Sequence, residues 1–596
     1  MCGIAGIFNS PNSVSVQNDI RRMTQTLHHR GPDGEGIFVE GPIALGHRRL
    51  SIIDLENGAQ PMESANKVAV ISFNGEIYNF PELRKQLLSE GYTFATQCDT
   101  EVILALYERY GEQCVDFLRG MFTFALWDRK QQKLMLARDR IGIKPLYYTQ
   151  QNNAVYFASE IKAIRAVLPI NELNTHAVNA YFTRQYIGGN DTIFKQIYKV
   201  PAGAFLVISA NGVETKRYWH PPLEDQIFSQ EEAAEQLNML LNEASANHLL
   251  SDVPVGVFLS GGLDSSCVLA YATKNANKKL HTFSVGFGEE SPLSETKFAA
   301  KLARKFGTIH HEIQVTHDEM LNALPLILQN LDEPFADYAI IPTYIMSKFA
   351  SEHVKVVLSG EGADELFGGY KRYHLYALFD MASKIGLNGF FGKNMLPGPS
   401  LFNDKTRRQL LNDRFGEMRQ LPSEQKIRSD KEAFFKAGHL NSMLYTDIRN
   451  WLVDDLLMKV DKMSMLASIE ARVPYLDHHL VEFVLPLQGT YKAGLTEKKK
   501  LLKNVANRIL PPEIWQRRKH GFTVPVSDWL KGPLHKQFKE IVFERSSHSE
   551  WINTAYVEKL LRQHENGTDV GFKLWSIFIF CSWMEMQVGR GIGSRQ

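Results

Sequence analysis

The sequence predicts a multidomain α/β protein whose two regions are built on different strand patterns. Its 596 residues are about twice the length at which one hydrophobic core stops growing. Up to about residue 205, short β-like segments alternate with glycine-rich turns. From residue 231 onwards, apolar strands alternate with helices, which indicates a parallel sheet, and helical patterns dominate after about residue 370. The stretch 206–230, with its double proline and acidic residues, predicts a linker.

Each region contains recognisable elements in a definite order. The predicted helix at 81–91 has proline in its first turn and glycine at its C-terminal end, and a second helix is predicted at 100–111. The strands of the first region are the segments 2–8, 43–53, 68–75, 121–128, 133–139 and 154–159. In the second region a helix at 231–250 precedes strands at 253–259, 281–287 and 354–359, with helices between the strands. This alternation predicts a parallel sheet with helical crossovers.

Composition and charge exclude several classes of function. The net charge of +1 gives no electrostatic basis for binding nucleic acid or an anionic membrane. The longest apolar run, 574–584, is about half the length of a membrane span, and no signal-peptide pattern opens the chain. The scattered cysteines form no CxxC pair, which argues against a disulfide framework or a zinc site: Cys2, Cys98, Cys114, Cys267 and Cys581. We therefore expect a cytoplasmic protein without nucleic-acid or membrane partners.

Cys2 is an unusual residue to open a strand. Once the initiator methionine is removed, Cys2 carries both a thiol and an α-amine, which titrate near pH ~8.5 and ~8. N-terminal nucleophiles use this pairing, because the amine serves as the base for the side chain. The alternative is a small apolar residue at the start of a buried strand, since free cysteine is among the most buried residue types. Residues 1–8 alone leave both interpretations open.

Two loops follow predicted parallel strands and have the chemistry of a nucleotide site. The loop SGGLDSS at 260–266 precedes a helix, so glycines allow close approach of phosphate and helix N-terminal amides can bind an anion. It is not a Walker A loop, because no GK[ST] follows. The loop SGEGADE at 359–365 occupies the same position after another strand. Each loop carries a carboxylate suited to Mg²⁺, Asp264 and Asp364, and a shared site requires neighbouring strands.

Ten motifs together resemble the glutamine-hydrolysing asparagine synthetases of the bacterial B type, over nearly the whole chain. They are MCGIAG (1–6), HRGPDGEG (29–36), HRRLSIID (47–54), NGEIYN (74–79), CDTE (98–101), GMFTFALWD (120–128), RDRIGIKPLYY (138–148), SGGLDSS, LSGEGADELFGGY (358–370) and DKMSMLASIEARVPYLDH (461–478). The resemblance implies a glutaminase domain at 2–205, a glutamine amidotransferase type 2 domain with the αββα sandwich of N-terminal-nucleophile hydrolases. It also implies a synthetase domain at 231–596, a Rossmann-like PP-loop ATP pyrophosphatase with a helical C-terminal part. The implied reaction uses ATP, Mg²⁺, glutamine and aspartate and gives asparagine, glutamate, AMP and pyrophosphate; a homodimer is compatible with it.

The resemblance also implies roles in the glutaminase site. Cys2 would attack the glutamine amide, and Asn74 with the amide of Gly75 would stabilise the oxyanion. Arg49 would bind the substrate carboxylate and Asp99 its ammonium group. The pocket would be completed by Glu76 and by the backbone of Leu50, Ser51, Ile52 and Ile53. The alternatives are that Arg49 is a surface arginine in the HRR run and that Asp99 is a helix N-cap, a role that does not exclude substrate binding.

In the synthetase domain the resemblance implies an ATP site on the two loops. The pyrophosphate would lie against Ser260, Gly261, Gly262, Asp264 and Ser265, and the adenosine against Val285, Ser359 and Gly360. Phe258 and Leu259 would also belong to the ATP site. Glu361 is the position tied to forming the β-aspartyl-AMP intermediate. Lys499 best matches a lysine that stabilises charge, but Lys498 and Lys500 leave the register open, and a solvated basic helix face is the alternative.

Three functions follow from the motifs, and they differ in the acceptor or in activity. The first is an amidotransferase with aspartate as acceptor, with ammonia moving through an internal passage implied only by the resemblance. The second amidates another carboxylate, such as a sugar acid, and enzymes of this kind share every motif. Tyr338, in the segment 336–344, departs from the family pattern of a small residue at this position and bears on the choice of acceptor. The third is a non-catalytic regulatory relative, which the intact Cys2, Asn74 and Asp264 disfavour.

Overall fold

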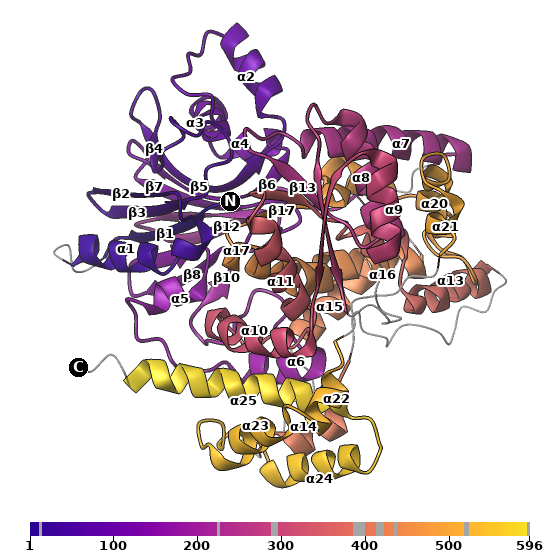
Figure 1. Cartoon of the computed structure of the whole chain (residues 1–596). Coiled ribbons are helices and arrows are strands. Elements are labelled where there is room, and N and C mark those ends of the chain that lie inside the picture. The colour runs from indigo at the N-terminus through magenta and orange to yellow at the C-terminus, as the bar shows by residue number, and fades with distance from the viewer. Residues whose placement is uncertain are drawn as a thin grey trace.

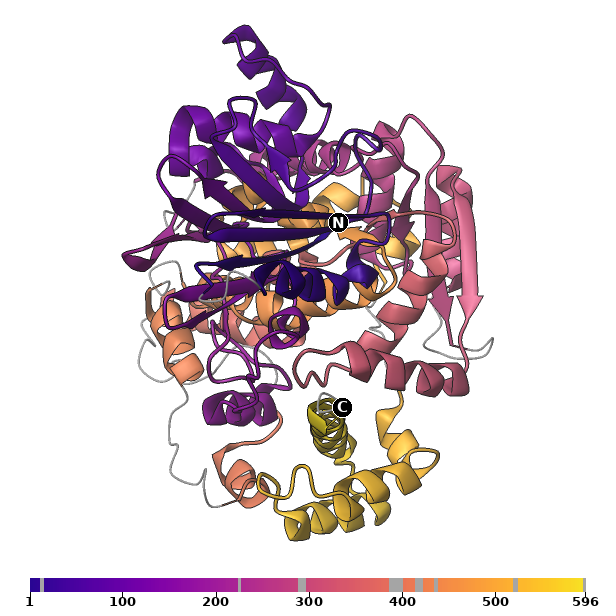
Figure 2. The same cartoon turned by 90° about the vertical axis from the view of Figure 1, so that its left-hand side faces the viewer.

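Two antiparallel sheets face each other in the N-terminal half (Figures 1 and 2). The computed structural model describes residues 1–10, 15–222, 227–287, 296–384, 400–412, 422–433, 438–517 and 524–592. The first sheet has the order β10 (Tyr198–Lys199), β8 (Tyr147–Gln151), β9 (Ala154–Ala158), β1 (Gly3–Phe8), β3 (Ile43–Arg49) and β2 (Gly34–Glu40). The second has the order β12 (Gly212–Arg217), β11 (Ala204–Ser209), β7 (Lys133–Arg138), β6 (Gly120–Asp128), β5 (Ala69–Ile77) and β4 (Met62–Glu63).

The two sheets enclose an apolar core and carry helices on their outer faces. Ile4, Leu45, Val70 and Trp127 are among the side chains buried between them. Helix α1 (Val16–Gln25) packs on β1 and β3, and α3 (Asp99–Tyr110) packs on β5, with α2 (Phe80–Ser89) beside α3. The predicted αββα sandwich is therefore confirmed, and β1 is buried along its whole length because it lies centrally in its sheet.

The second sheet extends beyond residue 205, where the sequence suggested that the first region ends. β11 pairs with β7 on one side and with β12 on the other, so the sheet reaches Arg217 and includes part of the stretch 206–230. The strand β12 has the sequence GVETKR and lies at the sheet edge with exposed side chains. Because edge strands bury few side chains, such a strand lacks the apolar signal that identifies a buried one.

A parallel five-stranded sheet forms the centre of the second half. Its order is β15 (Ile309–Gln314), β14 (His281–Gly286), β13 (Val255–Phe258), β16 (Val356–Leu358) and β17 (Glu470–Arg472). The flanking helices are α7 (Gln230–Asn247), α8 (Leu263–Asn275), α9 (Thr296–Phe306), α10 (His317–Asn330) and α11 (Ile340–Ser351). The predicted parallel sheet is confirmed, and β13 lies directly beside β16, so the loops that follow these two strands meet at one edge.

The remainder of the chain is mainly helical, as predicted. These helices are α4 (Cys114–Phe117), α5 (Ile161–Arg165) and α6 (Thr175–Arg184) in the first half, and α12 (Ala363–Phe367), α13 (Lys371–Lys384), α14 (Asp404–Leu410), α15 (Pro422–Ala433), α16 (His439–Arg449), α17 (Met458–Leu466), α18 (His478–Val484), α19 (Gly489–Lys492), α20 (Lys500–Ala506), α21 (Pro512–Trp515), α22 (Val526–Lys531), α23 (His535–Lys539), α24 (Thr554–Glu565) and α25 (Gly571–Ile592) in the second. The apolar run 574–584 lies in α25, where Trp575 and Phe578 are fully buried. Among the described residues, no helix has both the length and the apolar composition of a membrane span.

Candidate active sites

The N-terminus is buried between the two halves of the molecule. The ammonium group of Met1 lies 2.8 Å from Oε2 of Glu470, and neither side chain is exposed. The amide of Cys2 donates to Oδ1 of Asn74 at 2.8 Å, and the amide of Leu50 donates to the Cys2 thiol. Burial raises the pKa of the Cys2 thiol, although the nearby N-terminal ammonium group opposes this. Cys2 therefore needs a neighbouring base to act as a nucleophile.

Asn74 and Gly75 offer donors beside Cys2. Nδ2 of Asn74 is buried and has no hydrogen-bond partner within the described part of the chain. A buried unpaired donor costs free energy, so it indicates a ligand that is bound during function. A Cβ atom on Gly75 would lie 2.2 Å from the Met121 carbonyl oxygen, so only glycine lets β5 approach β6 here. This geometry suits an oxyanion site.

Arg49 lies at the end of β3 and binds a turn of the backbone. Its Nη1 donates to the Leu55 carbonyl at 3.1 Å, and its Nη2 donates to the carbonyls of Ile53 and Asp54 at 3.1 and 2.6 Å. These acceptors are neutral, so they orient the guanidinium without cancelling its charge. The adjoining backbone is also held in place, because the Ser51 amide donates to Asp33 and the Ile52 carbonyl accepts from Asp252.

Several buried carboxylates lie near one another in the pocket predicted for glutamine. Asp99 accepts a hydrogen bond from the Ile77 amide at 3.0 Å, and Cys98 occupies the N-cap position of α3. Burial raises the pKa of Asp99 to about 6 and raises that of Glu76 well above its usual range. Glu470 contributes to both shifts. A cationic ligand would relieve this repulsion, so the cluster suits an ammonium group.

Replacing Arg49 by lysine tests whether the guanidinium binds substrate. Arg49→Lys keeps the charge but loses the planar pair of donors. We expect the KM for glutamine to rise by about tenfold or more, which corresponds to about 1.4 kcal/mol of binding. Steady-state glutaminase kinetics measure the change, and ammonia-dependent turnover is the internal control. An unchanged KM for glutamine would return Arg49 to a purely structural role.

The two strand-end loops of the second half converge on one lysine. Nζ of Lys499 lies 2.6 Å from Oδ1 of Asp264 and 2.7 Å from Oδ1 of Asp364. Within the run 498–500, Lys499 contacts a carboxylate of each loop. Its backbone is left-handed, with φ of 51°, a conformation that costs free energy in a non-glycine residue and is common at functional sites. Gly369 leaves room for this contact, since a Cβ there would lie 1.7 Å from Asp364.

The first loop has the compact geometry of an anion-binding turn. The Ser260 amide donates to Oγ of Ser265 at 3.2 Å, and the Gly262 amide donates to Oγ of Ser260 at 3.3 Å. Gly261 has φ of 71°, and helix α8 starts at Leu263. A Cβ on Gly360 would lie 3.1 Å from Cβ of Asp264, so the two loops touch. Phe258 and Leu259 lead into the loop, and Val285 lies on the neighbouring strand β14.

Asp264 and Asp364 supply oxygen ligands of the kind that Mg²⁺ prefers. Both carboxylates lie within hydrogen-bond distance of a single Lys499 Nζ, so they face a common space. No group of three histidine, cysteine or acidic side chains within the described ranges could hold a metal alone. The residues therefore fit a magnesium ion that is bound together with phosphate oxygens of a nucleotide.

A second charged cluster borders the nucleotide loops. Lys459 on α17 lies 3.0 Å from Asp337, and Glu361 and Asp455 also act on its charge. Asp337 precedes Tyr338, which packs against Phe572 with ring centroids 5.4 Å apart. The segment 336–344 thus contributes both a carboxylate and an aromatic ring near Lys459.

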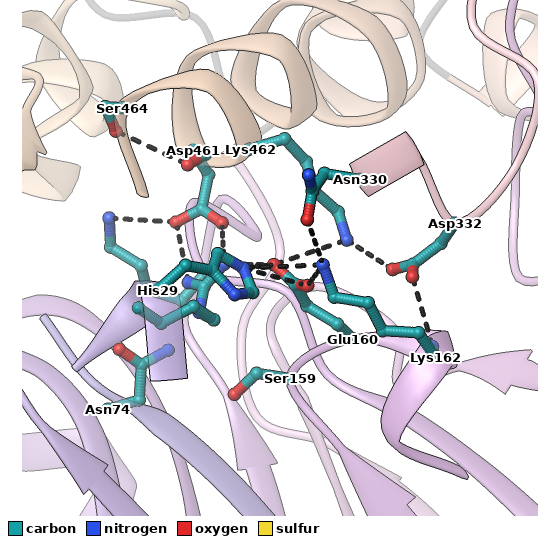
Figure 3. Close-up of polar contacts among 12 residues, drawn as sticks. His29, Asn74, Ser159, Glu160, Lys162, Asn330, Asp332, Asp461, Lys462 and Ser464 are labelled. Atoms are coloured by element: carbon teal, nitrogen blue, oxygen red, sulfur yellow. Dashed lines mark hydrogen bonds and ion pairs between the residues drawn. The ribbon is translucent and has the colours of Figure 1, made fainter. Parts of the chain in front are cut away.

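Buried charges join the two halves of the molecule (Figure 3). Nη1 of Arg30 lies 3.0 Å from Glu160 and 2.9 Å from Asp461 on α17. Lys462 pairs with Asp332 and reaches Glu160 at 3.6 Å. Such a network requires one docking arrangement, because removing either partner leaves an uncompensated buried charge. His29 contacts Glu160 at 3.2 Å, so it is part of this network.

A sandwich with an N-terminal cysteine, joined to a parallel sheet with two nucleotide-type loops, defines the class of two-domain glutamine amidotransferases. Residues 1–219 match the glutamine amidotransferase domain family, and residues 236–585 match the asparagine synthase family. The chain is 35% identical to asparagine synthetase [glutamine-hydrolyzing] 1 of Bacillus subtilis, over 99% of this chain and 97% of that protein. It is 36% identical to asparagine synthetase B of Escherichia coli, over 63% of this chain and 65% of that protein. The chain belongs to the asparagine synthase family.

Proposed function

We propose that this protein is an ATP-dependent amidotransferase that converts aspartate to asparagine with glutamine as nitrogen donor. Glutamine is hydrolysed at Cys2, and ammonia reacts with an acyl-adenylate of aspartate to give asparagine, glutamate, AMP and pyrophosphate. The observation that carries the proposal is that Lys499 joins Asp264 and Asp364 at the ends of adjacent parallel strands. The family match over both halves of the chain supports it further.

The glutaminase half would work through a covalent thioester. After removal of Met1, the Cys2 amine takes the proton of its own thiol, and the thiolate attacks the amide carbon of glutamine. Asn74 Nδ2 and the Gly75 amide stabilise the oxyanion, and ammonia leaves. Arg49 binds the substrate carboxylate, and Asp99 with Glu76 faces its ammonium group. Water then hydrolyses the thioester and releases glutamate.

The synthetase half would activate the acceptor at the two loops. Backbone amides of the loop 260–266 hold the pyrophosphate part of ATP, and Val285, Ser359 and Gly360 line the adenosine. Mg²⁺ held by Asp264 and Asp364 would supply charge neutralisation at the phosphates. Lys499 stabilises negative charge on the reacting phosphate, and Glu361 orients the acceptor carboxylate for attack, which forms the adenylate and releases pyrophosphate.

An internal passage between the sites is part of the proposal. Two small cavities share Tyr147 from the first half and Met458 and Lys462 from the second as lining residues. The second cavity also reaches Lys459, near Glu361. The cavities lie where the two halves meet, and on that ground we propose that ammonia crosses from the glutaminase half to the adenylate on this side of the interface.

Aspartate as the acceptor rests on the charges of the second cluster. Lys459 beside Asp337 and Asp455 offers both signs of charge, which suits an acceptor that carries an ammonium group and two carboxylates. We expect pyrophosphate release in the presence of ATP, Mg²⁺ and ammonia with aspartate, and background release with a sugar acid such as glucuronate. An acceptor screen by pyrophosphate assay tests this, and faster release with the sugar acid would favour the alternative acceptor.

The remaining features of the proposal concern the protein in the cell. We propose a cytoplasmic enzyme with small-molecule substrates, in keeping with its cysteine usage and charge. The glutaminase and synthetase domains would correspond to residues 2–205 and 231–596, with β12 as an edge extension of the first. The homodimer stays a hypothesis.

A further inference from the structure

The edge strand β17 connects the two proposed active sites. It lies last in the parallel sheet, next to β16 and close to the N-terminal half (Figure 1). Its side chains contact Met1 and Glu76 of that half. Glu470 and Arg472 are two residues apart, so their side chains point to the same face of the strand. Neither side chain is exposed, and Nε of Arg472 donates to Oε1 of Glu470 at 2.6 Å.

The side chain of Arg472 reaches the proposed glutamine pocket. Its Nη2 donates to Oε2 of Glu76 at 2.9 Å, across the boundary between the two halves. Its Nη1 donates to the carbonyls of His248 and Leu250 at 2.9 and 2.6 Å, at the end of helix α7. Four N–H groups of one rigid, planar guanidinium thus donate hydrogen bonds at once. Glu76 therefore cannot shift without disturbing the hydrogen bonds to Glu470, His248 and Leu250.

The backbone of Arg472 reaches the proposed ATP site. Leu358, the last residue of β16, pairs with Arg472 in the parallel register. The amide of the next residue, Ser359, donates to the Arg472 carbonyl at 2.8 Å. Ser359 opens the loop that continues to Glu361 and Asp364. One residue therefore contacts the ATP loop through its backbone and the glutamine pocket through its side chain.

We propose that Arg472 is a positioning residue that couples ATP binding to glutamine binding. A shift of Ser359 when ATP binds moves the Arg472 backbone, and the guanidinium carries that shift to Glu76. By thermodynamic linkage, glutamine then affects ATP affinity by the same factor. The inference rests on the proposed function, since it takes glutamine and ATP as the ligands of the two sites.

Binding measurements test the coupling without turnover. In the full-length Cys2→Ala protein, glutamine binds but is not hydrolysed, and ATP with Mg²⁺ is not consumed while the acceptor is absent. Calorimetry gives the Kd for glutamine with and without saturating ATP and Mg²⁺. We expect ATP to change this Kd by ~5-fold or more when Arg472 is present. Arg472→Lys keeps the charge but loses the planar set of guanidinium donors. In that variant we expect ATP to change the Kd for glutamine by less than ~2-fold.

A matched control is Arg119→Lys in the same background. Arg119 is also a buried arginine between the two halves, but its side chain pairs with Asp477 at 2.8 Å and with Glu243, which belong neither to the glutamine pocket nor to the ATP loop. We expect this variant to retain the ATP effect on the glutamine Kd. Loss of the effect in both variants would show that domain docking alone is responsible, and would overturn the specific role of Arg472.

Three further outcomes are decisive. An ATP effect that survives Arg472→Lys, or that is absent when Arg472 is intact, overturns the coupling but leaves the proposed function standing. Failure of Cys2→Ala to bind glutamine at all overturns the proposed function, and the inference falls with it. If Arg472→Lys does not fold, as judged by circular dichroism, Glu76→Met removes the acceptor of the same contact from its other end, with a side chain of similar length. Retained coupling in that variant would overturn the proposal.

Discussion

Cys2→Ala is expected to abolish glutamine-dependent synthesis and to leave ammonia-dependent synthesis nearly intact. The variant removes the nucleophile but no contact of the second half, since the Cys2 amide and its bond to Asn74 remain. Loss of a catalytic nucleophile commonly costs ~10⁴-fold or more in turnover. Glutamate release and asparagine formation, each measured with glutamine or with ammonium as nitrogen source, give both values.

Two results would contradict this expectation. Equal loss of both activities would show that the two sites are not separable. Glutamine-dependent activity in a protein whose intact mass retains Met1 would remove the α-amine from the mechanism, because the amine would then belong to another residue. Cys114→Ala is a suitable control, since Cys114 is also buried and outside any disulfide, and burial raises the pKa of its thiol.

The second large effect is expected for Asp364→Asn. The exchange removes one charge with little change in shape, and Lys499 is left with Asp264 alone. Pyrophosphate release should fall by ~10²-fold or more, if a transition-state contact of about 3 kcal/mol is lost. Glutamine hydrolysis at the other site should persist, which separates the loss of chemistry from unfolding.

Asp404→Asn provides the matched control for Asp364→Asn. Asp404 lies in the first turn of α14 and is exposed, so it has the helix position of Asp364 without its contacts to the loops. Full pyrophosphate release by Asp404→Asn is expected. If Asp364→Asn behaved in the same way, Asp364 would serve only the first turn of α12, and the second loop would have no part in the nucleotide site.

Strands that are marked in the sequence by an apolar run between turns were predicted well. The strands at 2–8 and 121–128 are apolar and bounded by turns, and they appear as β1 and β6. The adjacency of β13 and β16 followed from the demand that two aspartates share one site. The edge strand β12 was not predicted, because its polar side chains bury little surface.

Contacts between the two halves could not be predicted in the same way. Arg472 and Glu470 lie in a recognisable motif, but their partners Glu76 and Met1 are hundreds of residues away and depend on how the halves dock. The choice among the three lysines likewise depends on the left-handed backbone of Lys499, which no local pattern indicates. Residue types were informative about chemistry, whereas the assignment of partners required the folded chain.

The burial of Met1 sets an order of events during synthesis. Its ammonium group is enclosed against Glu470, which the ribosome adds 469 residues later, so a peptidase cannot reach it once β17 has docked. At roughly 5–20 residues per second, the N-terminus stays accessible for on the order of half a minute or more. If Cys2 is the nucleophile that we propose, removal of Met1 would therefore have to precede the docking of β17 on the N-terminus.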